Sequence, residues 1–208
     1  MMGGLQDSLN FYEIMAILLP GFLLVTGVAW SEGWFADKET IVNLSVGGMA
    51  VGLAASYVAG FLIQSPAYWL ENLYWRLWGG QPTLWVLRRE GLLLDKETEA
   101  QLVAEANVDA VQDEESRKAK WKETTKRWAV DVRKTPNRLE RFLGNYGLAR
   151  GVAGSAIALG LFLAFRHPAP LWHLFVLALV GLAAGRRMHV ASKDYAGELF
   201  LCHLQQKT

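Results

Sequence analysis

Few side chains in this sequence are of a type and spacing that could do chemistry, and those few stand at the ends of long apolar blocks. Glu13, Arg150 and Arg186 each mark a point where an apolar run meets charged sequence. If the blocks pack together, these three side chains would lie at a similar depth, and an ion pair among them would lock the helices to one another. We therefore expect a structural ion pair here, not a catalytic group.

Two other features do not assemble into an active site. Arg166 and His173 have the RxxxxxxH spacing of a ribonuclease motif, but they flank a short turn between two apolar blocks, where no such substrate is expected. The single cysteine, Cys202, cannot form an internal disulfide, and no CxxC or HExxH pattern occurs. We expect no enzyme activity, no catalytic residues, no cofactor and no metal site.

Four apolar blocks are the elements that must position these residues. Hydrophobic residues make up 52% of the chain and gather in uncharged runs, which is typical of a membrane protein. Each run approaches the roughly 20 residues that cross the hydrocarbon of a bilayer. The sequence therefore predicts an all-α, four-transmembrane-helix bundle with a helical cytoplasmic insertion between the second and third spans. The spans cover residues 11–30, 41–64, 147–165 and 169–185.

The first two spans carry distinct packing signals. Pro20, in LLPGF, predicts a kink, because proline frees a backbone carbonyl of the preceding turn. The second span has small residues at four-residue spacing, which place one smooth face along the helix. That face serves either packing within the bundle or contact in a homo-oligomer. Its residues are Gly48, Gly52, Ser56 and Gly60.

The distribution of basic residues predicts the orientation. Of the 21 lysines and arginines, 19 lie between Ser65 and Arg150 or after Gly185, which leaves only Lys38 and Arg166 in the two short connections. Because basic loops stay in the cytoplasm, we expect both termini and the large loop on the cytoplasmic side of a bacterial inner membrane.

The segment at residues 65–146 is expected to be a cytoplasmic helical domain. It begins with an aromatic amphipathic helix, whose Trp69, Tyr74 and Trp78 favour the membrane interface. The alternative is that the same stripe packs on the cytoplasmic domain. Asp95 is then expected to cap a helix over residues 96–111.

A second charged helix, over residues 113–134, carries Trp121 and Trp128 at helical spacing, and these tryptophans need a partner surface. Thr135 and Pro136 predict the start of a third helix that continues into the third span. The basic residues after Arg117 favour a solvated helix face over a site for anionic lipid or a negative ligand. Acids nearly balance bases in this loop, so we expect no nucleic-acid partner.

The tail at residues 186–208 is expected to continue the fourth span as an amphipathic helix. Tyr195, Leu199 and Cys202 fall on one side of that helix. We expect this side to pack against the cytoplasmic helices.

Five motifs are distributed along most of the chain: LLPGF, AGFLIQS, GGQP, NYGLARG and DYAGELF. Together they resemble a group of uncharacterised bacterial four-span inner-membrane proteins, some of which occur beside anti-phage systems. The layout is also similar to the membrane subunit of the Kiwa defence system and to small membrane accessories of CRISPR loci. The resemblance implies a role in anti-phage defence.

With the cytoplasmic helices, this resemblance favours an oligomeric membrane sensor or effector that binds a cytoplasmic partner or signal. No acid or base lies in the middle of a span, which argues against a proton pump. A channel or small-solute transporter, with serines such as Ser56 and Ser155 along its path, and a scaffold that anchors a cytoplasmic protein stay open as alternatives.

Overall fold

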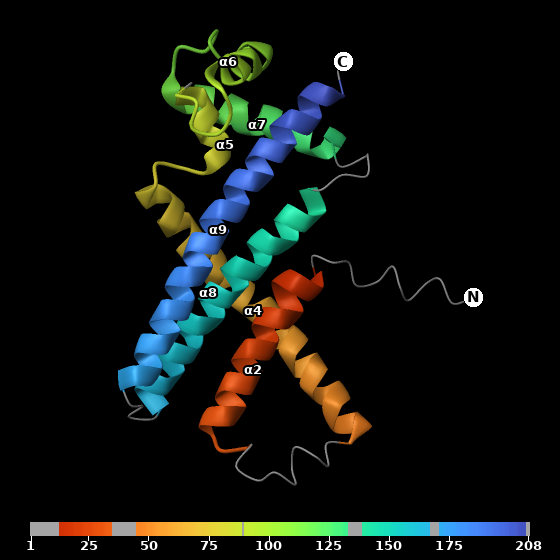
Figure 1. The fold of residues 1–208 in the computed structure, drawn as a ribbon, viewed down its shortest axis with the longest axis vertical. Helices are drawn as coiled ribbons and strands as arrows, with labels where there is room; N and C mark the ends of the chain where they lie inside the picture. The colour runs from red at the N-terminus through yellow and green to blue at the C-terminus, as the bar shows by residue number, and fades with distance from the viewer. Residues whose placement is uncertain (1–12, 35–44, 89, 133–138, 167–170, 207–208) are drawn as a thin grey trace, which may run out of the picture. The chain divides into compact units, whose positions relative to one another are not determined.

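A computed structural model of the chain describes residues 13–34, 45–88, 90–132, 139–166 and 171–206. These residues form helices and turns without a strand (Figure 1). Four helices are long and apolar enough to cross a membrane. The predicted all-α fold with four transmembrane helices is therefore confirmed.

The first spanning helix changes type at its start. A π-helical turn, η1 (Ile14–Leu18), leads directly into α2 (Leu19–Ser31), and Pro20 lies in the first turn of α2. Proline has no backbone N–H, so an ordinary α-helical hydrogen bond cannot form there. The structure has a π turn directly ahead of the proline, and the kink expected at Pro20 stays a prediction.

The second spanning helix, α4 (Val46–Leu77), is one helix of 32 residues and contains Pro66. The prediction that the span ends near Gln64 and is followed by a separate amphipathic helix is wrong. Pro66 leaves its backbone without a donor but does not end the helix, and the aromatic segment continues α4. At about 1.5 Å per residue, α4 is about 48 Å long, well beyond the hydrocarbon thickness of about 30 Å.

The last two spanning helices also extend past the apolar blocks. α8 (Leu139–Arg166) has 28 residues and α9 (Leu171–Gln205) has 35. The helix before the third span does continue into it, and the tail does continue the fourth span, as predicted. The expected cap at Thr135 and Pro136 and most of the predicted turn after Arg166 lie outside the described residues.

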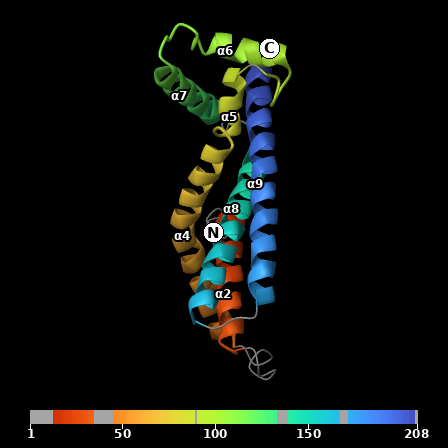
Figure 2. The same ribbon diagram turned by 90° about the vertical axis from the view of Figure 1, so that its left-hand side faces the viewer.

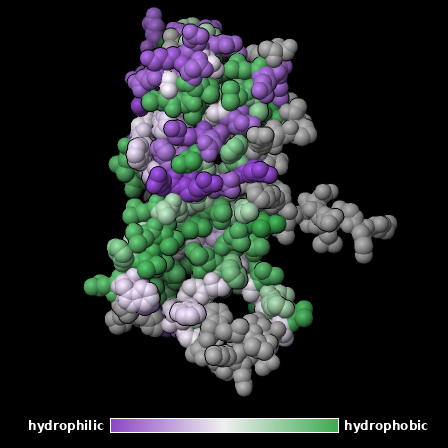
Figure 3. All heavy atoms as spheres, viewed as in Figure 1, coloured by the Kyte–Doolittle hydropathy of each residue, from purple (hydrophilic) through white to green (hydrophobic). Residues whose placement is uncertain are grey.

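The chain forms two compact units. The membrane unit comprises Met1–Leu73 and Gly144–His189, and the aromatic unit comprises Tyr74–Leu143 and Val190–Thr208. The predicted boundaries near residues 64, 146 and 185 thus shift to 73, 143 and 189. In the membrane unit, α2 and α4 cross, and α8 lies beside the first half of α9 in both views (Figures 1 and 2). On the face in Figure 3, hydrophobic side chains gather over these helices.

The aromatic unit contains four further short elements. They are α5 (Pro82–Trp85), the 3-10 helix η2 (Val86–Arg88), α6 (Lys96–Glu105) and α7 (Glu114–Val132). Asp95 caps α6 as predicted, since its Oδ1 accepts the Thr98 backbone N–H at 2.9 Å. The helix ends earlier than expected, because the chain turns at Asn107, whose φ is +49°.

The core of the aromatic unit is built on tryptophans. Trp121 is fully buried and its ring lies 5.8 Å from those of both Trp128 and Phe200. Its indole N–H donates to the Thr83 carbonyl at 2.7 Å. Leu199, Tyr195 and Cys202 form a second cluster with α7 and α8, so the tail packs on the helices as predicted.

Candidate functional site

Three helices of the membrane unit meet at residues without bulky side chains. A Cβ at Gly60 would stand 1.9 Å from the Ile17 carbonyl oxygen, and one at Gly21 would stand 1.8 Å from the Ser56 carbonyl oxygen. A Cβ at Gly151 would stand 2.4 Å from Cγ of Pro20. Only glycine allows these backbones to approach so closely, and such contacts hold helices together in lipid.

A polar network joins the same three helices. The Arg150 guanidinium, on α8, donates to Oε2 of Glu71 at 3.0 Å and to Oε1 of Gln64 at 2.6 Å, both on α4. The Gln64 amide donates in turn to the carbonyl of Ala16 in the π turn. Four groups far apart in the sequence therefore form one chain of hydrogen bonds.

Pro20 explains why Ala16 takes part. In an α-helix the carbonyl of residue 16 would accept the N–H of residue 20, which proline lacks. An unpaired carbonyl in an apolar bundle costs several kcal/mol, so the Gln64 side chain supplies the missing donor. Ser155 of α8 stabilises the same turn, because its hydroxyl donates to the Pro20 carbonyl at 2.9 Å.

The network is well shielded from solvent. The Glu71 side chain is 4% exposed and that of Arg150 is 16% exposed. A charge that loses its water must be paired, and the Arg150–Glu71 contact combines an ion pair with a hydrogen bond. Removing Glu71 would take a carboxylate away from the shielded Arg150 guanidinium, and removing Arg150 would take the guanidinium away from the buried Glu71.

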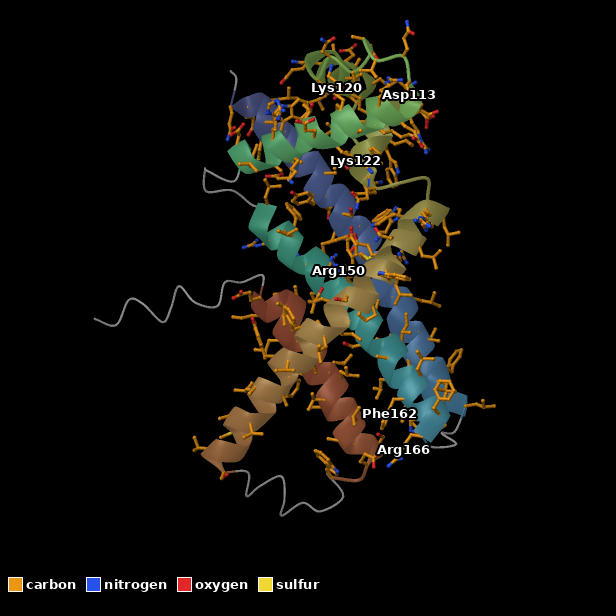
Figure 4. All side chains as sticks on the ribbon, turned by 180° about the vertical axis from the view of Figure 1, so that it is seen from behind. Asp113, Lys120, Lys122, Arg150, Phe162 and Arg166 are labelled. Carbon is orange, nitrogen blue, oxygen red and sulfur yellow. The ribbon has the colours of Figure 1, made fainter. Side chains whose placement is uncertain are left out.

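A second ion pair lies at the other end of α8. Figure 4 shows Arg150 part-way along this helix and Arg166 at its end. Sixteen residues separate them, which is about 24 Å of helix and close to the hydrocarbon thickness. Arg166 Nε lies 3.8 Å from Glu32 Oε1, and the Arg166 side chain is 68% exposed. The apolar stretch of α8 thus runs from a buried pair to an exposed one.

The ion pair that the structure describes at Arg150 is not the one predicted among Glu13, Arg150 and Arg186. Arg150 is the centre of the network, where it contacts Glu71 and Gln64. Arg186 is exposed and forms no ion pair with a described residue, so the structure does not bring it to Glu13. A contact of Glu13 with Arg150 stays a prediction.

The small-residue face of α4 divides into two halves. Ser56 and Gly60 are buried and pack against α2. Gly48 is half-buried, and a Cβ at Gly52 would meet nothing within 4 Å. Half of the face therefore serves packing within the bundle, and an oligomer contact at the other half stays a prediction.

The predicted partner surface is wrong. Trp121 is 0% exposed and Trp128 is 8% exposed, because both pack on Phe200 of α9. Their partner is the chain's own tail, so they present no surface to another protein. The hydroxyls of Ser56 and Ser155 are likewise engaged with backbone carbonyls, so within one chain neither serine lines an open path.

The predicted interface residues lie on exposed and half-buried positions. Trp69 is 80% exposed and Trp78 is 55% exposed, whereas Tyr74 is half-buried and its ring lies 5.1 Å from that of Trp75. The alternative that this stripe packs on the domain does not hold for Trp69. Its position at the membrane surface stays a prediction.

Sequence reasoning missed Gln64 and Glu71 as partners. Gln64 is the one amide side chain in the apolar part of α4, and it lies one turn after Gly60, which contacts the proline turn. A lone amide beside a proline-freed carbonyl is the signal that could have identified it. Nothing in the sequence indicated that Glu71 is buried, because it lies on the helix face opposite an apolar stripe, and an acid on such a face is normally exposed to water.

No protein-family model, curated protein or solved structure matches this chain. Among the described residues, no group of three or more His, Cys, Asp or Glu side chains could hold a metal ion. The network contains a guanidinium, a carboxylate and an amide but no nucleophile with an adjacent base. These groups are suited to holding the helices in one arrangement.

Proposed function

We propose that the protein is a membrane-embedded sensor or effector whose helical loop and tail bind a cytoplasmic partner or signal. The proposal includes the bacterial inner membrane, cytoplasmic termini, a homo-oligomeric state and a role in anti-phage defence. One observation carries it: single helices belong both to the bundle and to the aromatic core.

α9 is the clearest case. Its first half is a candidate span, and its last turns supply Ala196, Phe200 and His203 to the aromatic unit. Phe200 is fully buried against both tryptophans, and His203 stacks on Trp128 at 4.1 Å. A partner that rearranges this core would act directly on the helix that forms the fourth span.

α8 repeats the arrangement. Leu139, near its start, is buried in the cluster with Val132 and Leu199, and Arg150, eleven residues later, is the centre of the buried network. Both residues belong to the single helix α8. Displacement of α8 along its axis would pull Arg150 from Glu71, so the network is suited to distinguish two states of the bundle.

The test breaks helix continuity without touching either packed region. Val190, 39% exposed on α9, is the first residue of the second segment of the aromatic unit. Val190→Pro removes a helical hydrogen bond at this point, whereas Val190→Ala keeps the helix. The chain is expressed with its genomic neighbours, and phage plating and membrane depolarisation are measured.

We expect Val190→Pro to abolish the phage-dependent response while the protein still inserts in the membrane, and Val190→Ala to respond as the original chain does. A wild-type chain that changes neither phage plating nor membrane potential would contradict the proposal. A fully active Val190→Pro would show that helix continuity carries no signal.

A further inference from the structure

One face of the first half of α9 is apolar from end to end and finishes in arginine. Its large side chains recur at intervals of three or four residues, so they lie above one another along the helix. They are Leu171, Phe175, Leu179 and Leu182, which are 84%, 64%, 50% and 71% exposed. Arg186 follows four residues later in the same row, and Arg187 adjoins it.

Both arginines are exposed, and neither forms an ion pair or hydrogen bond with a residue that the structure describes. They differ in this from Arg150, which is buried against Glu71, and from Arg166, which lies near Glu32. Two adjacent guanidinium groups without a carboxylate partner leave a concentrated positive charge. Guanidinium groups pair well with phosphate, because their donors match its oxygens.

The spacing along α9 matches the dimensions of a lipid. Fifteen residues separate Leu171 from Arg186, which is about 22 Å of helix. Arginine side chains at the end of a span extend toward the headgroup zone while their stems stay on the apolar surface. The row therefore offers an apolar track for an acyl chain and a cationic end for a phosphate.

We propose that this face of α9 is a binding site for an anionic phospholipid, with the headgroup phosphate on Arg186 and Arg187 and an acyl chain along the row from Leu182 toward Leu171. This inference rests on the membrane-spanning character of α9 and not on the sensor function proposed above. It is distinct from general solvation by lipid, because it requires preference for a negative headgroup.

A second copy of the chain is the competing occupant. Two parallel copies packed along this row would bring Arg186 of each close to Arg186 of the other, and like charges repel. The negative headgroup of an anionic lipid would neutralise the positive charge of the arginines, whereas a second copy would bring an equal positive charge beside it. Charge complementarity therefore favours the lipid.

The test measures lipid binding to the full-length chain in a mild detergent by native mass spectrometry. Phosphatidylglycerol and phosphatidylcholine with identical acyl chains are added separately. At about 1 kcal/mol for each basic residue, two arginines imply a preference of about 30-fold for phosphatidylglycerol. The preference should shrink as salt is raised, because exposed charges are screened.

Three variants separate the possibilities. Arg186→Gln with Arg187→Gln should abolish the preference, and Arg186→Lys with Arg187→Lys should retain most of it. Lys118→Gln with Arg127→Gln removes the same charge from exposed positions on α7 and should leave the preference unchanged.

Equal binding of the two lipids, or a preference that survives Arg186→Gln with Arg187→Gln, would overturn the proposal. A preference lost equally in the α7 control would do so too, because net charge alone would then explain it. If the glutamine variant changed the number of copies in the complex and not lipid binding, the face would be an interface between chains.

Discussion

The two units solve the burial of a carboxylate in different ways. In the membrane unit, Glu71 is 4% exposed and pairs with the Arg150 guanidinium at 3.0 Å. In the aromatic unit, Glu99 is 0% exposed and accepts three backbone N–H groups, from Gly91, Leu93 and Leu94, at 2.8, 3.1 and 3.2 Å. The first solution joins two helices, and the second closes one loop onto α6.

The same contrast extends to what holds each unit together. The aromatic unit buries tryptophan and phenylalanine, which stabilises a fold where water is the alternative. The membrane unit leaves most of its large apolar side chains exposed and relies on close backbone contacts and the polar network. Lipid is as apolar as leucine, so moving a leucine side chain from lipid into the bundle contributes little to stability. Close packing of small residues contributes more.

Loss of a core tryptophan should have the largest effect. Trp121→Ala removes a fully buried ring and its hydrogen bond to Thr83, and should lower the free energy of unfolding of the aromatic unit by about 3–5 kcal/mol. Limited proteolysis of the chain in detergent measures this. Val130→Ala, at a 54% exposed position of the same helix, should leave the cleavage pattern unchanged. Equal resistance of both variants would contradict the tryptophan core.

Loss of the network carboxylate should come next. Glu71→Ala removes the carboxylate that pairs with Arg150 at 3.0 Å in a shielded position. It should cost about 3 kcal/mol, seen as a lower midpoint of thermal unfolding in detergent. Glu32→Ala breaks the pair with the 68% exposed Arg166 and should cost less than about 1 kcal/mol. If the two variants had the same midpoint of thermal unfolding, the network would contribute no more to stability than a surface ion pair does.

A methyl group at the helix crossing should have a smaller effect. Gly60→Ala places a Cβ against the Ile17 carbonyl and must push α2 and α4 apart, at a cost of about 2 kcal/mol. Gly52→Ala, on the same face of α4 but in open space, should be neutral or slightly stabilising, because alanine favours helix. Thermal unfolding of the pair measures the difference, and equal midpoints would argue against a close crossing.

Local sequence patterns correctly predicted those features of the fold that depend on residues close together in the chain. Asp95 predicted the start of α6, and the apolar runs predicted four spanning helices. Both signals are read from one continuous stretch of sequence. Arg150 was recognised as an ion-pair residue, but Glu71 and Gln64 lie 79 and 86 residues away from it. The apolar run ends near Gln64, but α4 continues through Pro66 to Leu77, so hydropathy alone does not mark where that helix ends.

The smallest expected effect concerns Asp95, an exposed carboxylate of the aromatic unit. Hydrogen bonds from the Thr98 side chain and backbone hold the pKa of Asp95 below its ordinary value of 3.8. A carboxyl with a lowered folded pKa contributes stability above its unfolded pKa, and that contribution is lost as pH falls through the folded pKa. The amide hydrogens in the first turn of α6 should therefore lose protection below about pH 4, near the unfolded value, where protection is the exchange rate of an unstructured peptide divided by the observed rate at the same pH.

Asparagine is an equally good helix cap but does not titrate. Asp95→Asn should thus keep the protection of the Thr98 and Glu99 amides high at pH 7 and should not lose it in acid, whereas Asp95→Ala should show low protection at both pH values. A loss of protection in acid that persists in Asp95→Asn would place the acid sensitivity elsewhere in the unit. Asp113, whose pKa is also lowered, by the Ser116 N–H at the start of α7, is then the residue to change.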